Sequence, residues 1–97
     1  MDIISKRYTN FRQFLKDIGL SSNEYVKELD GCSTLIFVSK LRQEIEKFEG
    51  DNNEKIESGF HELVEYMNLD LSKYNNDDIT KFKRFLLYFY TVSIELY

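Results

Sequence analysis

The chain has 97 residues, of which 42% are hydrophobic and 15% aromatic, and its formal net charge is −4 at pH 7. This length predicts one domain, 1–97, built around a single core. The acidic balance argues against direct nucleic-acid binding, because affinity for phosphates requires clustered Lys and Arg.

Cysteine content and hydropathy bear on the expected location. Cys32 is the only cysteine, so an internal disulfide is excluded and a reducing compartment, the cytoplasm, is expected. Residues 1–11 lack the apolar run of a signal peptide. The apolar closing stretch, 81–97, is shorter than the roughly 20 residues that cross a membrane, so we expect no membrane contact.

The first predicted element is an α-helix over about 3–18. Its apolar residues recur at spacings of four and three, which place them on one side of a helix: Ile4, Tyr8, Phe11, Leu15 and Ile18. Asp2 is expected to cap the start of this helix, and Gly19 is expected to end it in a left-handed conformation.

A short second helix is predicted to end at Gly31. Ser21 stands three residues before Glu24, which is the spacing of a capping box. The apolar residues that follow are Tyr25, Val26 and Leu29.

The third element, which begins with the sequence TLIFVS at 34–39, has two possible interpretations. The β-branched content of this stretch is typical of a buried strand, which would make the protein an α+β domain. The apolar residues Val38, Leu41, Ile45 and Phe48 instead continue at helical spacing, and Ser33 stands where a helix cap is needed. Because no second stretch alternates as a partner strand would, we predict one helix over about 34–49.

A fourth helix is predicted over about 53–68 from the spacing of Ile56, Phe60, Leu63, Val64 and Met67. After the connector 68–76, Asn76 is expected to cap the last helix, with Asp77 and Asp78 in its first turn.

The last helix is apolar over more than half of its circumference. The residues on this wide face are Ile79, Phe82, Phe85, Leu86, Phe89, Tyr90, Val92 and Leu96. A helix with so wide an apolar face must be covered by several neighbours. The predicted fold is therefore all-α, a compact single-domain bundle of four to five helices with the C-terminal helix at its centre. The alternative is that part of this face is an interface with another molecule.

Residues with catalytic potential are few. Glu57, His61 and Glu65 are spaced four apart and could hold a divalent metal, but they lie opposite the apolar side of their helix, whereas metal ligands in bundles point inward. His61 is the only histidine, and the four glycines stand singly, at expected helix ends, so no phosphate-binding loop is present. We predict no catalytic residue, no metal site and no cofactor, and expect that the protein is not an enzyme.

The clearest functional signal is the uneven distribution of charge. Between Glu44 and Glu65 there are eight acidic and two basic residues, a local balance of −6, so the rest of the chain carries +2. We predict that the third and fourth helices form an antiparallel hairpin, which would merge their acidic faces into one patch. The alternative is an ordinary solvated surface with local pairs such as Lys47 with Glu44.

This pattern predicts a non-enzymatic protein-binding module, an inhibitor or immunity-type protein that neutralises a basic partner such as a nuclease toxin by occluding its positive cleft. The expected partner is a basic toxin or nucleic-acid-handling protein, and the protein itself is expected to be a monomer or a weak homodimer. The predicted partner-binding residues are the acidic residues of this region and two tyrosines beside it: Glu46, Asp51, Glu54, Glu57, Glu62, Glu65, Tyr66 and Tyr74.

The alternative function is a helical interaction or oligomerisation module that acts through its aromatic C-terminal helix. The residues predicted to form that interface are Tyr88, Val92, Leu96 and Tyr97.

Overall fold

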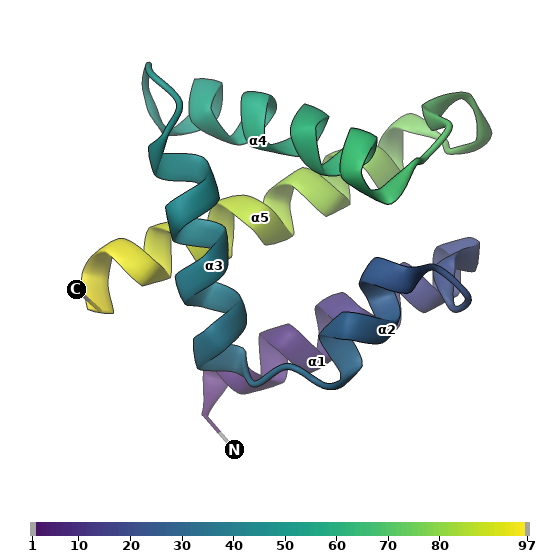
Figure 1. Cartoon of the computed structure of the whole chain (residues 1–97), viewed down its shortest axis with the longest axis horizontal. Helices are drawn as coiled ribbons and strands as arrows, with labels where there is room; N and C mark the ends of the chain where they lie inside the picture. The colour runs from purple at the N-terminus through teal and green to yellow at the C-terminus, as the bar shows by residue number, and fades with distance from the viewer. Residues whose placement is uncertain (1, 97) are drawn as a thin grey trace.

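The computed structural model describes residues 2–96, and the side chains of 2–95. Within this range the chain forms five α-helices and two short helical turns, and no strand: α1 (Ile3–Leu15), the π-helical turn η1 (Lys16–Leu20), α2 (Glu24–Asp30), α3 (Thr34–Glu46), α4 (Asn52–Met67), the 3₁₀ turn η2 (Leu71–Lys73) and α5 (Asn76–Leu96). The predicted all-α class is confirmed (Figure 1). The strand considered for 34–39 is wrong, because these residues form the first turns of α3.

Three of the predicted helix-end residues are confirmed. The Asp2 side chain accepts the backbone N–H of Ser5 at 2.8 Å, and the Ser33 side chain accepts that of Ile36 at 3.2 Å. Gly19 has a φ of 93°, the left-handed conformation that glycine adopts without a steric cost. The first helix does not remain α-helical up to that glycine, because it widens into a π-helical turn from Lys16 onward.

Two predicted caps are wrong by one or two residues. Asn23, rather than Ser21, caps α2 by accepting the backbone N–H of Tyr25 at 2.9 Å. Its side-chain amide also donates to the carbonyl oxygen of Met67 at 3.1 Å, so the same residue joins the start of α2 to the end of α4. The cap of α5 is Asn75 rather than Asn76, since its side chain accepts the backbone N–H of Asp78 at 2.8 Å.

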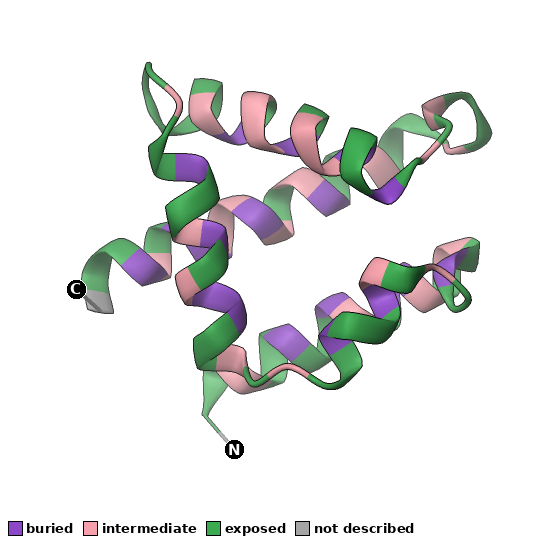
Figure 2. Ribbon diagram, viewed as in Figure 1, coloured by how far each residue is buried: buried purple, intermediate pink, exposed green. Residues whose placement is uncertain are grey.

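The position of α5 at the centre of the bundle is confirmed. Its rings contact rings on three other helices: Phe89 lies 5.8 Å from Phe11 of α1 and 5.2 Å from Phe37 of α3, and Phe82 lies 5.3 Å from Phe60 of α4, between ring centroids. The buried residues face the middle of the molecule (Figure 2). Within the described residues, no helix is both long and apolar enough to cross a membrane.

The predicted antiparallel hairpin of α3 and α4 is wrong. Figure 1 shows α3 running from α1 to α4 and crossing α5, so that α3 and α4 lie crosswise and meet only near the loop that joins them. Close contact at this crossing depends on Gly59, which lies inside α4 and not at a helix end as predicted: a Cβ there would overlap Cδ1 of Ile45, which is buried in α3. Each helix packs its own apolar side on α5, which sets their directions independently.

Candidate functional site

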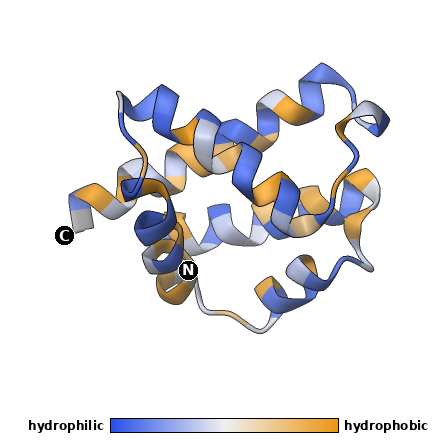
Figure 3. Ribbon diagram, turned by 45° about the horizontal axis from the view of Figure 1, so that its top comes forward, coloured by the Kyte–Doolittle hydropathy of each residue, from blue (hydrophilic) through white to orange (hydrophobic). Residues whose placement is uncertain are grey.

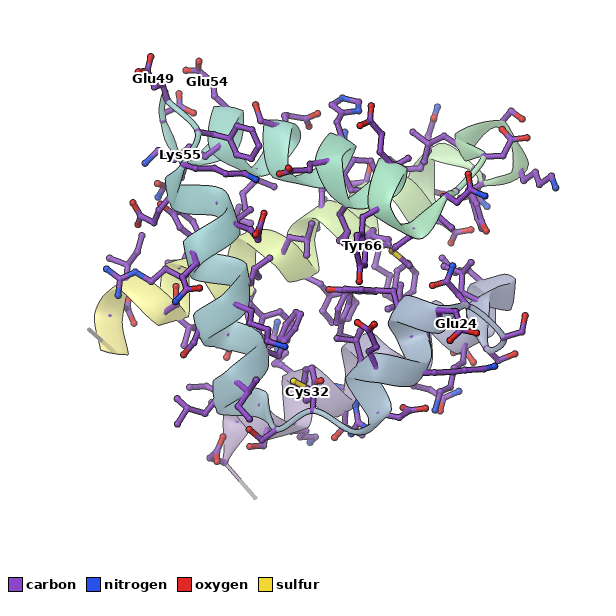
Figure 4. All side chains as sticks on the ribbon, viewed as in Figure 1. Glu24, Cys32, Glu49, Glu54, Lys55 and Tyr66 are labelled. Carbon is purple, nitrogen blue, oxygen red and sulfur yellow. The ribbon has the colours of Figure 1, made fainter. Side chains whose placement is uncertain are left out.

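The acidic residues of α4 form a line along its outer side. Glu54, Glu57 and Glu65, with His61 between them, follow one another at spacings of three and four and are all exposed. Glu49 and Asp51 continue this line into the loop between α3 and α4. We call the five carboxylates the acidic edge: Glu49, Asp51, Glu54, Glu57 and Glu65. Figure 4 shows Glu49 and Glu54 projecting outward at the corner where α3 meets α4, and Figure 3 shows that the first turn of α4 is largely hydrophilic.

Asp51 and Glu54 are positioned by a capping box at the start of α4. The Asp51 carboxylate accepts the backbone N–H of Glu54 at 2.9 Å, and the Glu54 carboxylate accepts the backbone N–H of Asp51 at 3.4 Å. The helix dipole favours negative charge at this end. Backbone N–H groups at the start of α4 therefore hold these two carboxylates in place, with no basic side chain in the described part of the chain to neutralise them.

Glu62, which the sequence also predicted for partner binding, is held inside the protein's own charge network. The Lys47 ammonium donates to Glu62 at 2.7 Å and to Glu44 at 2.9 Å, a bridge from α4 to the end of α3. These two carboxylates, Glu62 first, raise the pKa of Lys47 above its usual value. The predicted pair of Lys47 with Glu44 is thus present, although Lys47 also makes a contact between helices.

Glu46 is exposed, but its carboxylate is engaged in contacts within the protein. Its carboxylate accepts a hydrogen bond at 3.0 Å from the hydroxyl of Tyr90, a buried residue of α5. Arg42 and Lys55 lie 3.8 and 3.9 Å from it. Burial, followed by the hydrogen bond to Glu46, raises the pKa of Tyr90. Glu46 thus joins α3 to α5, while 43% of its side chain remains exposed.

The members of the acidic edge differ in how far they are already neutralised. Glu57 forms an ion pair with Lys83 of α5 at 2.9 Å. In the part of the chain that the structure describes, the other four members form no ion pair: Glu49, Asp51, Glu54 and Glu65. These four are therefore the carboxylates that a basic partner could approach without displacing an internal cation.

A groove of about 820 Å³ lies between α2, α3 and α4, and the sequence did not reveal it. Its apolar lining comes from all three helices: Leu29, Phe37, Leu41, Ile45 and Leu63. Ile36 and Tyr66 also line it and remain 51% and 65% exposed, which is unusual for large apolar side chains. One sequence feature could have indicated this groove, namely the run of four apolar residues at 35–38. Only Phe37 and Val38 of this run are buried in the core, so the other two apolar side chains are left at the surface.

The two predicted tyrosines have different environments. Tyr66 extends from α4 toward α2, where its ring meets the ring of Tyr25 edge-on at 5.8 Å (Figure 4). Tyr74 is half-buried against the core and does not line the groove. Of these two tyrosines, only Tyr66 is exposed at the mouth of the groove, next to Glu65 in the chain.

The described residues contain no group of three or more His, Cys, Asp or Glu side chains placed to hold a metal ion. Glu57 and His61 lie 4.0 Å apart, but both are on the outer side of α4, without an inward-facing ligand from another helix. Cys32 is half-buried at the margin of the groove.

Comparison of the chain with protein-family models, with curated proteins and with solved structures gave no significant match.

Proposed function

We propose that this protein is a non-enzymatic binding module that docks a basic protein partner on its acidic edge, as an inhibitor or immunity-type protein does when it covers the positive cleft of a nuclease toxin. The proposed setting is the cytoplasm, in keeping with the single cysteine Cys32.

One observation carries this proposal. The segment from Glu44 to Glu65 has a balance of −6, and four of its carboxylates are exposed along one edge without an internal ion pair. Carboxylates placed side by side without a counterion make the local electrostatic potential more negative. This potential accelerates the approach of a basic partner and selects against acidic partners.

The test compares two double charge reversals that change the net charge equally. Glu54→Lys/Glu65→Lys reverses the acidic edge, and the matched control Asp17→Lys/Glu95→Lys reverses exposed carboxylates on η1 and α5. With an oligoarginine peptide as probe, calorimetry is expected to show about tenfold weaker binding for the first variant, or about 1.4 kcal/mol, and little change for the second.

The same pair of variants applies to partners from the native host. Basic proteins retained by the wild-type protein and by the control variant should be lost with the edge variant. If both variants behave alike with the peptide and with the host proteins, the acidic edge is not the docking surface.

A second candidate function is self-association through the end of α5. Ile94 is 41% exposed there, and Tyr88 and Val92 are half-buried, while Tyr97 and the side chain of Leu96 fall outside the described residues. Light scattering over a range of protein concentrations tests it: a constant monomer mass would dispose of this candidate.

A further inference from the structure

The groove between α2, α3 and α4 lies directly beside the acidic edge. Around the axis of α4, at 100° per residue, Glu65 lies on the outer line, Glu62 comes next, and Tyr66, Gly59 and Leu63 follow on the groove side. Less than half a turn therefore separates the carboxylates from the apolar wall. A partner segment that lies along α4 against the acidic edge would cover the mouth of the groove as well.

The side walls of the groove carry negative charge on both sides. On the α2 wall, Glu28 lines the groove and Glu24 stands one turn before it, on the side of α2 that faces α4 (Figure 4). On the α4 wall, Glu62 lines the groove and Glu65 stands next to Tyr66. Two of these four carboxylates are already paired, Glu24 with Lys27 at 3.7 Å and Glu62 with Lys47 at 2.7 Å, and Lys40 of α3 also lines the groove. Within the described residues Glu28 and Glu65 form no ion pair, so one unpaired carboxylate remains on each wall.

The floor of the groove is apolar, and some of its apolar side chains are exposed to solvent. Ile36 and Tyr66 are more than half exposed at the mouth, above the buried side chains of Phe37 and Ile45. Exposed apolar surface rimmed by charged residues is typical of an interaction site. An apolar centre between two acidic walls is complementary to a segment with an apolar stripe and basic flanks.

We propose that this groove receives an amphipathic α-helix of the basic partner, with its apolar side chains against Ile36, Leu63 and Tyr66 and its Lys or Arg side chains against the α2 and α4 walls. This inference rests on the proposed function and adds to it the shape and chemistry of the docking segment. Such a helix would present anchors at positions i, i+4 and i+7, the pattern of helices that bind in grooves. The eight residues from i to i+7, with three flanking residues at each end, give a docking helix of about 14 residues.

The experiment selects binders from a displayed library of helical peptides about 14 residues long, which span about 20 Å. The target is the wild-type protein, with counter-selection against the variant Ile36→Ser/Tyr66→Ala. The expected result is enrichment of sequences with apolar residues at i, i+4 and i+7 and with Lys or Arg on both flanks. No enrichment, or enrichment of sequences without that pattern or with acidic flanks, would overturn the proposal.

The chain contains a closely matched control for the groove variant. Leu35 is 64% exposed and adjacent to Ile36 in α3, but it does not line the groove. Leu35→Ser should leave the affinity of a selected peptide within about twofold, whereas Ile36→Ser should weaken it about tenfold or more. Equal effects of the two substitutions would overturn the groove assignment. Because both side chains are exposed, both variants should keep the helical circular dichroism and the melting temperature of the wild-type protein.

The outcomes separate this inference from the proposed function. If Ile36→Ser leaves binding of selected peptides unchanged while Glu54→Lys/Glu65→Lys weakens binding of oligoarginine, the acidic edge is correct and the groove is not. If Ile36→Ser weakens binding of selected peptides while Glu54→Lys/Glu65→Lys leaves binding of oligoarginine unchanged, the groove is a docking site and the acidic edge is not. If the wild-type protein dimerises in solution and Ile36→Ser abolishes the dimer, the groove is covered by a second copy of this chain and the proposal is wrong.

Discussion

At the scale of single residues, two tyrosines of the core form hydrogen bonds between helices through their hydroxyls. The hydroxyl of Tyr8, a residue only 2% exposed, donates to the carbonyl oxygen of Leu29 at 2.7 Å, and the hydroxyl of Tyr90 donates to Glu46. Each bond joins two helices, α1 to α2 and α3 to α5. A buried ring thus supplies apolar area while its polar tip finds a partner, as a buried phenol requires.

These tyrosines predict a loss of stability at alkaline pH. Burial is the main cause that raises the pKa of Tyr8 and of Tyr25 well above the usual value near 10. The raised pKa means that stability is fully present below about pH 10 and declines above it, because the unfolded chain loses these protons first. Urea unfolding at a series of pH values from neutral to strongly alkaline should show a falling free energy of unfolding above pH 10.

The variant Tyr8→Phe separates the hydrogen bond from the titration. It should lower the free energy of unfolding at neutral pH by about 1 kcal/mol, since Leu29 loses its hydrogen-bond donor, and should also make the alkaline decline shallower. Tyr66→Phe, at an exposed tyrosine, is the control and should do neither. A Tyr8→Phe curve that runs parallel to the wild-type curve at high pH would contradict this account.

At the scale of helices, local signals determine where the elements start, and contacts between helices determine how they cross. The capping box of α4 is local, because Asp51 and Glu54 are three residues apart. The crossing of α3 and α4 instead depends on the fit between Gly59 and Ile45, which no local pattern indicates.

The capping role of Asp51 can be separated from its charge. Asp51→Ala removes the hydrogen bond to the Glu54 backbone and should lower the free energy of unfolding by about 1 kcal/mol. Asp51→Asn keeps an acceptor oxygen and should change it by only a few tenths of a kcal/mol. If the acidic edge binds basic partners, both variants should weaken binding to a similar degree. Equal stability losses for the two variants, measured by denaturant unfolding, would show that charge rather than capping stabilises this helix start.

The contact between Gly59 and Ile45 predicts non-additive substitutions. Gly59→Ala alone should destabilise the protein by up to about 2 kcal/mol, because the cost of overpacking, about 1–3 kcal/mol, is offset by a gain in helix propensity of about 1 kcal/mol. In the background Ile45→Val, which lacks the overlapping Cδ1 atom, the same substitution should be neutral or stabilising. A thermal or chemical denaturation cycle measures the coupling, and identical effects in both backgrounds would refute the predicted overlap.

At the scale of the whole molecule, charge and hydrophobicity are separated in space. Aromatic side chains from α1, α3 and α4 surround α5, while the five carboxylates of the acidic edge lie on the outer side of α4 and the adjoining loop. Unpaired like charges on one edge repel one another, so the arrangement that attracts a basic partner slightly destabilises the free protein.

This separation predicts opposite effects of salt on folding and on binding. Raising the ionic strength from about 0.1 M to about 1 M shortens the screening length from about 10 Å to about 3 Å. The melting temperature of the free protein should rise slightly, while its affinity for oligoarginine should fall. In Glu54→Lys/Glu65→Lys both responses should be smaller. Affinity independent of salt would rule out an electrostatic docking surface.

Much of the helical structure follows from the sequence, because its signals are local. The spacing of Tyr8, Phe11 and Leu15 and the capping residues Asp2 and Ser33 correctly indicate where helices form. Ser21 and Asn76 were misassigned because several residues near these helix starts can cap, and the choice depends on distant contacts such as that of Asn23 with Met67. The acidic edge is also local, since exposed residues at spacings of three and four on one helix share a side whatever the rest of the fold does.

Three features follow from the sequence alone: the all-α class, the central place of the last helix, and the line of carboxylates on α4. Three others appear only when the helices are packed together: α3 and α4 cross rather than pair, Glu46 and Glu62 make contacts between helices, and Ile36 and Tyr66 border a groove. The difference lies in the sequence separation of the interactions. Periodicity and capping act between residues a few positions apart, whereas the groove depends on how three separate helices pack around α5.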